Sequence, residues 1–132
     1  MGHDLKPVLV TGASGYLGGH VIAALGDGAQ GIGSANCDLL DAAAVADLIP
    51  DWSERRVIHL AAQVPKTATG YADDEAGEAN LRMVEVLLAQ RPRHLIFASS
   101  MTVYRADDPM PVREDNAGPP ARGYAGSKRR TE

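Results

Sequence analysis

The sequence is poor in the features that mark several classes of protein. It holds a single cysteine, Cys37, so an intrachain disulfide framework is excluded. No Cys-x-x-Cys pair occurs and the four histidines are scattered along the chain, which argues against a metal site. No apolar run approaches the roughly 18 residues of a membrane span, and residues 1–6 lack an apolar signal core. These absences predict a cytoplasmic protein that holds no metal and meets no membrane.

Positive charge and aromatic side chains are also scarce. The formal net charge of −4 argues against nucleic acid as the main partner. No Lys or Arg occurs between Lys6 and Arg55. With one Phe and one Trp, the core must consist of Ala, Val, Leu and Ile. A hydrophobic fraction of 45% over 132 residues is enough for the core of one domain.

The chain is organised around one glycine-rich stretch, residues 8–18. It begins with an apolar run that predicts a buried strand, and apolar residues recur at helical spacing behind it. Between strand and helix stand three glycines spaced three apart, Gly12, Gly15 and Gly18. Strand, glycine turn and helix in this order are typical of a dinucleotide site.

Each glycine has a separate reason to be there. Gly12 would let the chain turn sharply, Gly15 would let a pyrophosphate approach the backbone, and Gly18 would let the helix pack closely on the sheet. The N–H groups of the first helical turn, which includes Tyr16 and Leu17, would then face the phosphates together with the helix dipole. The alternative is a glycine-rich turn that binds nothing.

Apolar and amphipathic segments alternate along the rest of the chain, which predicts an α/β fold. We expect strands at residues 7–11, 29–33, 57–62 and 94–98, and helices at residues 15–25, 42–49 and 75–90, with a further helix from Tyr124. The fourth strand is apolar and should lie at the edge of the sheet, where it invites pairing with another chain. Arg55 and Arg56, just before the third strand, are expected to be solvated.

The stretch from Thr11 to Gly18 resembles the T-G-x-x-G-x-x-G motif of short-chain dehydrogenases/reductases, and more narrowly that of the extended branch, the NAD-dependent epimerase/dehydratase family. Further motifs follow in the family's order and extend the resemblance from Val8 to Lys128: Asp38-Leu39, His59-Leu60-Ala61-Ala62, the S-S-x-x-V-Y of residues 99–104, and the Tyr-x-x-x-Lys of residues 124–128. The resemblance implies a Rossmann-type doubly wound parallel sheet, for which we expect the strand order 3-2-1-4.

The resemblance also assigns cofactor contacts beyond the glycine turn. In the family the Asp-Leu pair, here Asp38 and Leu39, lies against the adenine, although a loop acid of this kind can equally cap a turn. Leu60, Ala61 and Ala62 would form the strand end that the cofactor approaches. Asn80 matches the family's N-x-x-G-T, but Met83-Val84 replaces the Gly-Thr, so its role near the cofactor is weakly supported.

Ser100, Tyr124 and Lys128 are the catalytic residues that the resemblance implies. Tyr124 and Lys128 are four residues apart, so on a helix they share one face. A free tyrosine, with a pKa near ~10, is a poor base at neutral pH, and we expect the nearby ammonium to lower that pKa. In the family Lys128 would also reach the nicotinamide ribose, which makes Tyr124 and Lys128 cofactor contacts as well, while Ser100 would hold the substrate oxygen.

The expected cofactor is NAD, with NADP as a possibility. The end of the second strand, residues 33–36, lacks the usual ribose-binding acid. Because Lys and Arg are absent from residues 7–54, a clamp for the extra phosphate of NADP cannot come from this part of the chain. We therefore expect hydride transfer to or from NAD, with a sugar nucleotide or a related alcohol or ketone as the small-molecule substrate.

Family members continue well past Tyr-x-x-x-Lys, with more strands and a carboxyl-terminal substrate domain. We therefore expect residues 1–132 to be a partial NAD(P)-binding Rossmann domain. Its parent would be an epimerase, dehydratase or reductase that forms a homodimer, and this chain alone would be inactive. The alternative is a dinucleotide-binding module without catalysis, and which substrate the parent would use stays open.

Overall fold

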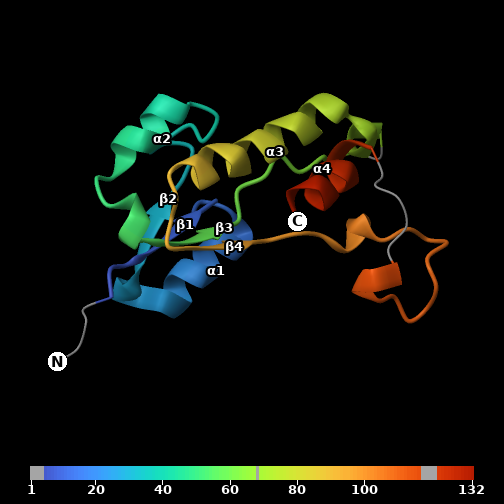
Figure 1. Ribbon diagram of the computed structural model, residues 1–132, viewed down its shortest axis with the longest axis horizontal. Helices are drawn as coiled ribbons and strands as arrows, with labels where there is room; N and C mark the ends of the chain where they lie inside the picture. Colours follow the sequence, from blue (N-terminus) through green and yellow to red (C-terminus); the bar gives the residue numbers. More distant parts are fainter. Residues whose placement is uncertain (1–4, 68, 117–121) are drawn as a thin grey trace. The chain divides into compact units, whose positions relative to one another are not determined.

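The computed structural model describes residues 5–67, 69–116 and 122–132 (Figure 1). Four strands and four α-helices alternate along these residues, with short 3₁₀ turns between them. In chain order they are β1 (Val8–Thr11), α1 (Tyr16–Leu25), β2 (Ala29–Ile32), α2 (Ala42–Leu48), β3 (Arg56–His59), α3 (Asp74–Ala89), β4 (His94–Phe97) and α4 (Gly123–Thr131). The expected elements are all confirmed, with ends that shift by up to three residues.

Two compact units make up the chain. Residues 1–62 and 83–98 form the first, which we call the sheet unit. Residues 63–82 and 99–132 form the second, which we call the α4 unit. Helix α3 contributes its first half to the α4 unit and its second half to the sheet unit.

The sheet is parallel throughout, and its strand order is β2-β1-β3-β4. The expected order 3-2-1-4 was wrong, because β3 pairs with β1 and not with β2. Among the described residues, 33–41 form turns between β2 and α2, so no further strand extends the sheet beyond β2. The doubly wound arrangement is nonetheless confirmed, since the chain leaves β1 in one direction to form β2 and then crosses to form β3 and β4.

The composition of the strands explains this order. The middle residues of β2, Gln30 and Gly31, are exposed, which suits a strand at an edge. In β3, Val57 and His59 are buried, which suits a place beside β1 in the interior. The sequence pattern predicted two apolar strands and one weak strand, but it could not say which of them would flank β1.

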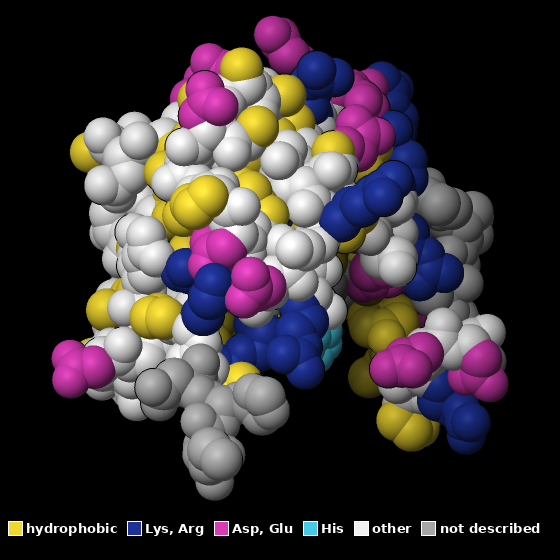
Figure 2. Space-filling model, turned by 60° about the vertical axis from the view of Figure 1, so that its left-hand side comes forward, with side chains coloured by type: hydrophobic (Ala, Val, Ile, Leu, Met, Phe, Trp, Pro, Cys, Tyr) yellow, Lys and Arg dark blue, Asp and Glu magenta, His cyan; other side chains and the backbone are white. Residues whose placement is uncertain are grey.

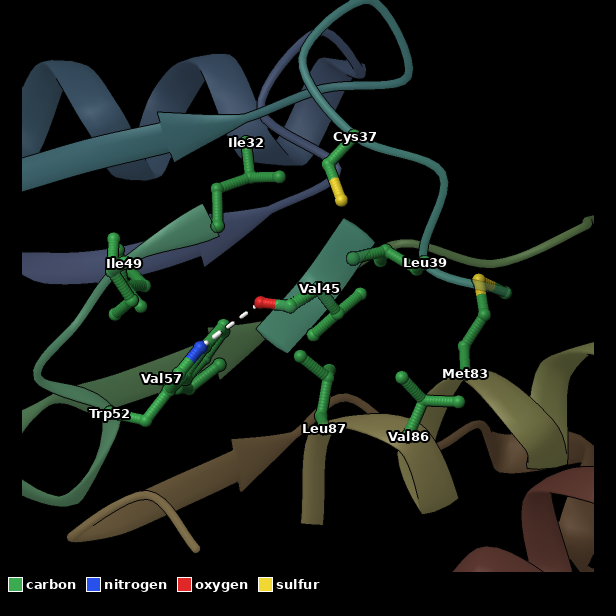
Figure 3. Close-up of a cluster of buried hydrophobic side chains, with 11 residues drawn as sticks. Ile32, Cys37, Leu39, Val45, Ile49, Trp52, Val57, Met83, Val86 and Leu87 are labelled. Carbon is green, nitrogen blue, oxygen red and sulfur yellow. Dashed lines mark hydrogen bonds between the residues drawn. The ribbon is translucent and has the colours of Figure 1, made fainter. Parts of the chain in front are cut away.

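The core of the sheet unit lies on the face of the sheet that carries α2 and the second half of α3 (Figure 3). Leu9, Ile32 and Val57 from the strands pack against Val45 of α2 and Leu87 of α3. Trp52 is buried among them, and its indole N–H donates to the carbonyl oxygen of Val45 at 3.0 Å. A tryptophan buried with its N–H satisfied fits the apolar centre of a core.

Helix α1 covers the opposite face of the sheet (Figure 1). On β4, which lies at the edge as expected, Ile96 is 53% exposed. Leu17 and Leu25 of α1 are also exposed. Association through β4 stays a prediction.

A network of charges surrounds Arg55, which was wrongly expected to be solvated. Its side chain is buried and donates to Gln30 Oε1 at 2.5 Å, and its guanidinium lies 3.6 Å from Asp51 Oδ2. Lys6 Nζ contacts the same carboxylate at 2.7 Å and reaches Glu54 at 3.0 Å. On the face seen in Figure 2, Lys and Arg side chains likewise stand beside Asp and Glu side chains. Pairing of this kind lets a buried guanidinium keep its charge.

Candidate active site

The glycine turn after β1 has the close packing that its spacing predicts. Gly12 has φ +67°, a backbone conformation that favours glycine, and a Cβ there would lie 2.8 Å from the backbone nitrogen of Ala61. A Cβ on Gly18 would overlap the carbonyl group of Gly12. The turn and the first turn of α1 are therefore in contact through backbone atoms, and two of the three glycines are required by sterics alone.

Gly15 differs from the other two glycines. A Cβ there would meet only the carbonyl oxygen of Gly12, at 3.3 Å. Helix α1 begins directly after it, and Gly15 has no side chain with which to cap the helix. Tyr16 and Leu17 of the first turn are exposed. The turn thus leaves the start of α1 accessible, and its backbone fits a pyrophosphate held by the N–H groups of a helix N-terminus.

Thr11 is a residue of this site to which our sequence analysis gave no role. Its buried Oγ1 accepts hydrogen bonds from the N–H groups of Leu60 and Ala61, each at 3.1 Å. The same oxygen lies 2.7 Å from Nδ1 of the buried His59. Thr11 thereby joins the carboxyl ends of β1 and β3, the edge of a parallel sheet at which ligands bind. The leading Thr of T-G-x-x-G-x-x-G was the signal that could have found it.

Asp38 and Leu39 have surroundings that differ from each other. Asp38 is exposed, and its Oδ1 accepts from the N–H of Leu40 at 2.9 Å, so it does cap a turn. Leu39 is buried in the core beside Cys37. Of the pair, Asp38 alone has an exposed side chain. Contact of these two residues with adenine stays a prediction.

Tyr124 and Lys128 share one face of α4, as their spacing predicts. Lys128 Nζ lies 5.6 Å from the centre of the Tyr124 ring. Lys128 is buried, and burial lowers the pKa of its ammonium. The pKa of Tyr124 is raised, first by burial and then by the neighbouring Tyr71, while a side-chain hydrogen bond with Ser100 acts in the opposite direction. We expected the ammonium to lower the pKa of Tyr124, and this was wrong because burial is the largest cause of the shift and raises that pKa.

Ser100 follows β4 and is held by a residue that sequence reasoning did not single out. Its Oγ accepts from the backbone N–H of Thr102 at 3.2 Å and lies 2.8 Å from Thr102 Oγ1. The neighbouring Ser99 donates to a carboxylate oxygen of Glu132 at 2.5 Å. A serine hydroxyl often bonds the backbone N–H two residues further on, so the contact of Ser100 with the N–H of Thr102 is a local turn pattern.

Two further residues shape the surroundings of Tyr124 in the α4 unit. The ring of Tyr71 packs edge-on against the ring of Tyr124, with centroids 5.6 Å apart and planes at 82°. Asn80 is buried, and its side-chain amide bonds both the N–H and the C=O of Gln63, at 2.6 and 3.1 Å. Asn80 therefore fixes the start of the loop that leads to Tyr71.

The predicted residues thus fall into two sets. The glycine turn, Asp38, Leu39 and residues 60–62 belong to the sheet unit, and Ser100, Tyr124 and Lys128 belong to the α4 unit. In the part of the chain that the structure describes, no group of His, Cys, Asp and Glu could hold a metal ion. Over the same residues no helix combines the length and apolar character needed to cross a membrane.

Comparisons with known proteins agree with these motifs. The sequence profile of the NAD dependent epimerase/dehydratase family matches residues 8–132. UDP-glucuronate 4-epimerase 1 of Arabidopsis thaliana is 32% identical over 160 residues, an alignment that covers 95% of this chain and 37% of the relative.

Solved structures give the same result. A GDP-L-fucose synthetase from Naegleria fowleri bound to NADP matches with a TM-score of 0.74 and 25% identity. The match covers 99% of this chain and 43% of the synthetase chain. A short-chain dehydrogenase/reductase superfamily protein from Agrobacterium tumefaciens with bound NAD matches with a TM-score of 0.65 and 29% identity. This match covers 93% of this chain and 42% of the Agrobacterium tumefaciens chain. These likenesses confirm the Rossmann-type fold. The chain spans less than half the length of each of these three proteins.

Proposed function

Because the chain belongs to the NAD dependent epimerase/dehydratase family, we propose that it supplies the dinucleotide turn and the catalytic side chains of an enzyme that acts on a sugar nucleotide by hydride transfer. The observation that carries the proposal is the grouping of Ser100, Tyr124 and Lys128 in one compact unit. The steric demand for glycine in the turn after β1 supports the dinucleotide part.

The proposed chemistry divides a hydride and a proton between two acceptors. A secondary alcohol of the substrate loses its carbon-bound hydrogen as hydride and its hydroxyl proton, and so becomes a ketone. The acceptor for the hydride would be supplied by NAD when it is bound. Tyr124 takes the hydroxyl proton in this direction and returns it to the ketone oxygen in the reverse direction, which is general acid–base catalysis. Ser100 holds the substrate oxygen, and Lys128 positions the ribose of the cofactor.

Burial suits Tyr124 to the second of these directions. Its raised pKa keeps the phenol protonated at neutral pH, which is the form that donates a proton to a ketone oxygen. Lys128, with a lowered pKa, holds its proton less firmly than an exposed lysine does. The substrate class rests on relatives, namely the UDP-glucuronate 4-epimerase and the GDP-L-fucose synthetase described above.

A second candidate function is a dinucleotide-binding module without catalysis. The observation in its favour is that the glycine turn, with its steric demand for glycine, lies in a compact unit that contains none of Ser100, Tyr124 and Lys128. Both functions require the glycine turn, but only the first requires the hydroxyl of Tyr124. The two are separated by a substitution that removes this hydroxyl and leaves the turn intact.

The test is Tyr124→Phe in a version of the protein that carries the further length of its relatives. Turnover of UDP-sugars should fall by roughly 10²–10⁴-fold, the usual loss for a general acid–base group, while NADH affinity stays nearly unchanged. Tyr104→Phe, which removes another tyrosine hydroxyl in the α4 unit, is the matched control and should retain turnover. Activity within about threefold of the unchanged protein after Tyr124→Phe would contradict the role of Tyr124. NADH binding without turnover in the unchanged version would favour the second function.

A further inference from the structure

Helix α4 carries the proposed catalytic pair but has weak intrinsic support. It is nine residues long and begins at Gly123, which has φ +62°. The preceding residue, Arg122, makes no side-chain capping bond to it. Isolated helices shorter than about 12–15 residues are marginal in water. The first turn of α4 therefore depends on contacts from elsewhere in the α4 unit.

Asp74, the first residue of α3, supplies the missing cap from another helix. Its Oδ1 accepts a hydrogen bond from the N–H of Gly123 at 2.9 Å. Its Oδ2 accepts from the guanidinium of Arg122, from Nε at 3.2 Å and also from Nη2. A carboxylate usually caps the helix to which it belongs, whereas here it lies 49 residues away from the N–H that it caps.

The electrostatics of the position favour a negative charge on Asp74. The residue lies in the first turn of α3 and contacts the first turn of α4, so two helix N-termini face its carboxylate. The pKa of Asp74 is lowered, first by the hydrogen bond with Arg122 and then by the N–H of Gly123, with a smaller effect from Arg130. Asp74 is therefore ionised at neutral pH, which is the form that accepts both bonds.

Close backbone packing also fixes the start of α4 against the start of α3. A Cβ on Gly77, one turn along α3, would lie 2.7 Å from the carbonyl oxygen of Gly123. A Cβ on Gly123 would overlap the carbonyl oxygen of Tyr71. The starts of α3 and α4 thus touch through backbone atoms, and small shifts of one would displace the other.

Tyr124 is the next residue after the capped N–H, and its ring packs against that of Tyr71 in the segment before α3. We propose that Asp74 is a positioning residue for Tyr124, because its carboxylate caps α4 at Gly123 and so fixes the place from which the Tyr124 ring projects. This inference rests on the proposed function for its catalytic meaning, but the geometry that it claims can be measured on this chain without cofactor or substrate.

Arg122 provides a way to separate the cap from the ion pair. Its side chain is 83% exposed, and exposed ion pairs contribute little to stability. Glu78, one turn further along α3, pairs with Arg130 of α4 at 2.6 Å and joins the same two helices without touching Gly123. Glu78→Gln and Arg122→Ala are therefore matched controls for Asp74→Ala.

The experiment measures two properties of the 132-residue chain. The first is the hydrogen-exchange rate of the Gly123 amide by NMR at neutral pH. The second is the titration of Tyr124, followed by tyrosinate absorbance and identified by the loss of its transition in Tyr124→Phe. Burial raises the pKa of Tyr124, so a loosened ring should titrate closer to the ordinary value of about 10. The other groups that face it, Tyr71, Ser100 and Lys128, are unchanged in all these variants.

We expect Asp74→Ala to speed exchange at Gly123 by about tenfold, the factor expected when one hydrogen bond is lost, and to lower the pKa of Tyr124. Asp74→Asn keeps an acceptor oxygen, so its effect should be smaller and in the same direction. Glu78→Gln and Arg122→Ala should change neither quantity.

An unchanged Gly123 exchange rate and Tyr124 titration in Asp74→Ala would overturn the proposal, as would equal changes in Glu78→Gln. If Asp74→Ala unfolds the α4 unit entirely, the isosteric Asp74→Asn decides on the same two readouts. A chain that binds no NADH but shows these shifts would contradict the proposed function alone.

Discussion

At the scale of single residues, Thr11 shows what the leading position of the glycine motif does in this fold. One buried hydroxyl oxygen accepts from two backbone N–H groups and contacts a buried histidine. Buried N–H groups that lose their acceptor carry a large penalty because they have no water to replace it. Thr11 is therefore a structural requirement of the strand ends at which we expect the cofactor.

This gives a prediction at the same scale. Thr11→Val keeps the shape of the side chain but removes the acceptor from the N–H groups of Leu60 and Ala61. Urea unfolding should show a loss of about 1–3 kcal/mol, the cost of leaving buried polar groups unsatisfied. Thr11→Ser keeps the hydroxyl and serves as the control, with a smaller loss. If the Thr11→Val chain were as stable as the Thr11→Ser chain, the hydroxyl oxygen of Thr11 would not contribute to the free energy of unfolding.

Whether the role of a single residue could be predicted depended on how far along the chain its contacting residues lie. The glycine positions could be predicted because their local demands are enough, since Gly12 has φ +67° in the turn itself and Gly18 packs against the carbonyl group of Gly12. Thr11 and Asp74 could not, because their partners lie 48–50 residues away. No local pattern in the sequence points to such contacts, although the family motif did place Thr11 next to the turn.

At the scale of elements, strand types were predictable and strand neighbours were not. The apolar run of β3 and the polar run of β2 were both visible in the sequence, and the structure uses them as interior and edge strands. Their order depended on which strands pair with β1, and the structure pairs β1 with β2 on one side and with β3 on the other. Helix α4, which carries the proposed catalytic pair, was predicted by motif, but its cap comes from α3 and was missed.

The cap on α4 makes a prediction about pH. The pKa of Asp74 is lowered in the folded chain, so its stabilising effect is present above the unfolded pKa of about 3.9 and is lost as pH falls through the folded value. The Gly123 amide proton should therefore shift upfield in NMR spectra as pH falls below about 4.

Asp74→Asn offers the control for this titration, since an amide does not ionise in this range. The Gly123 amide of that variant should show little movement with pH. Glu78→Gln should keep the same titration as the unchanged chain. A Gly123 signal that moves identically in Asp74→Asn would mean that another acid governs the start of α4.

At the scale of the whole molecule, the glycine turn and the proposed catalytic residues Ser100, Tyr124 and Lys128 lie in separate compact units. The chain spans 37% of the UDP-glucuronate 4-epimerase that it matches and 43% of the GDP-L-fucose synthetase. The proposed cofactor contacts come from both units, the turn after β1 in the sheet unit and Lys128 in the α4 unit. Dinucleotide binding and turnover are separate readouts, and binding can be measured directly on the 132-residue chain.

The choice between NAD and NADP depends on the charge of the whole first half of the chain. No Lys or Arg lies between Lys6 and Arg55, and an extra phosphate on the ribose needs such a group nearby. The two solved structures described above hold one cofactor each, NADP in one and NAD in the other, so both cofactors occur among the structural neighbours of this chain. For this chain we predict that NADH binds at least as well as NADPH.

The central claim is that the glycine turn binds a dinucleotide, and calorimetric titration with NADH tests it most directly. The unchanged chain should bind NADH at least as tightly as NADPH. Gly15→Asp should abolish binding, because it places a carboxylate where the phosphates approach and like charges repel. Gly19→Ala, in the same helix and with open space for its Cβ, should bind normally. Equal binding by the Gly15→Asp variant and the unchanged chain, or no binding by a folded unchanged chain, would contradict the claim.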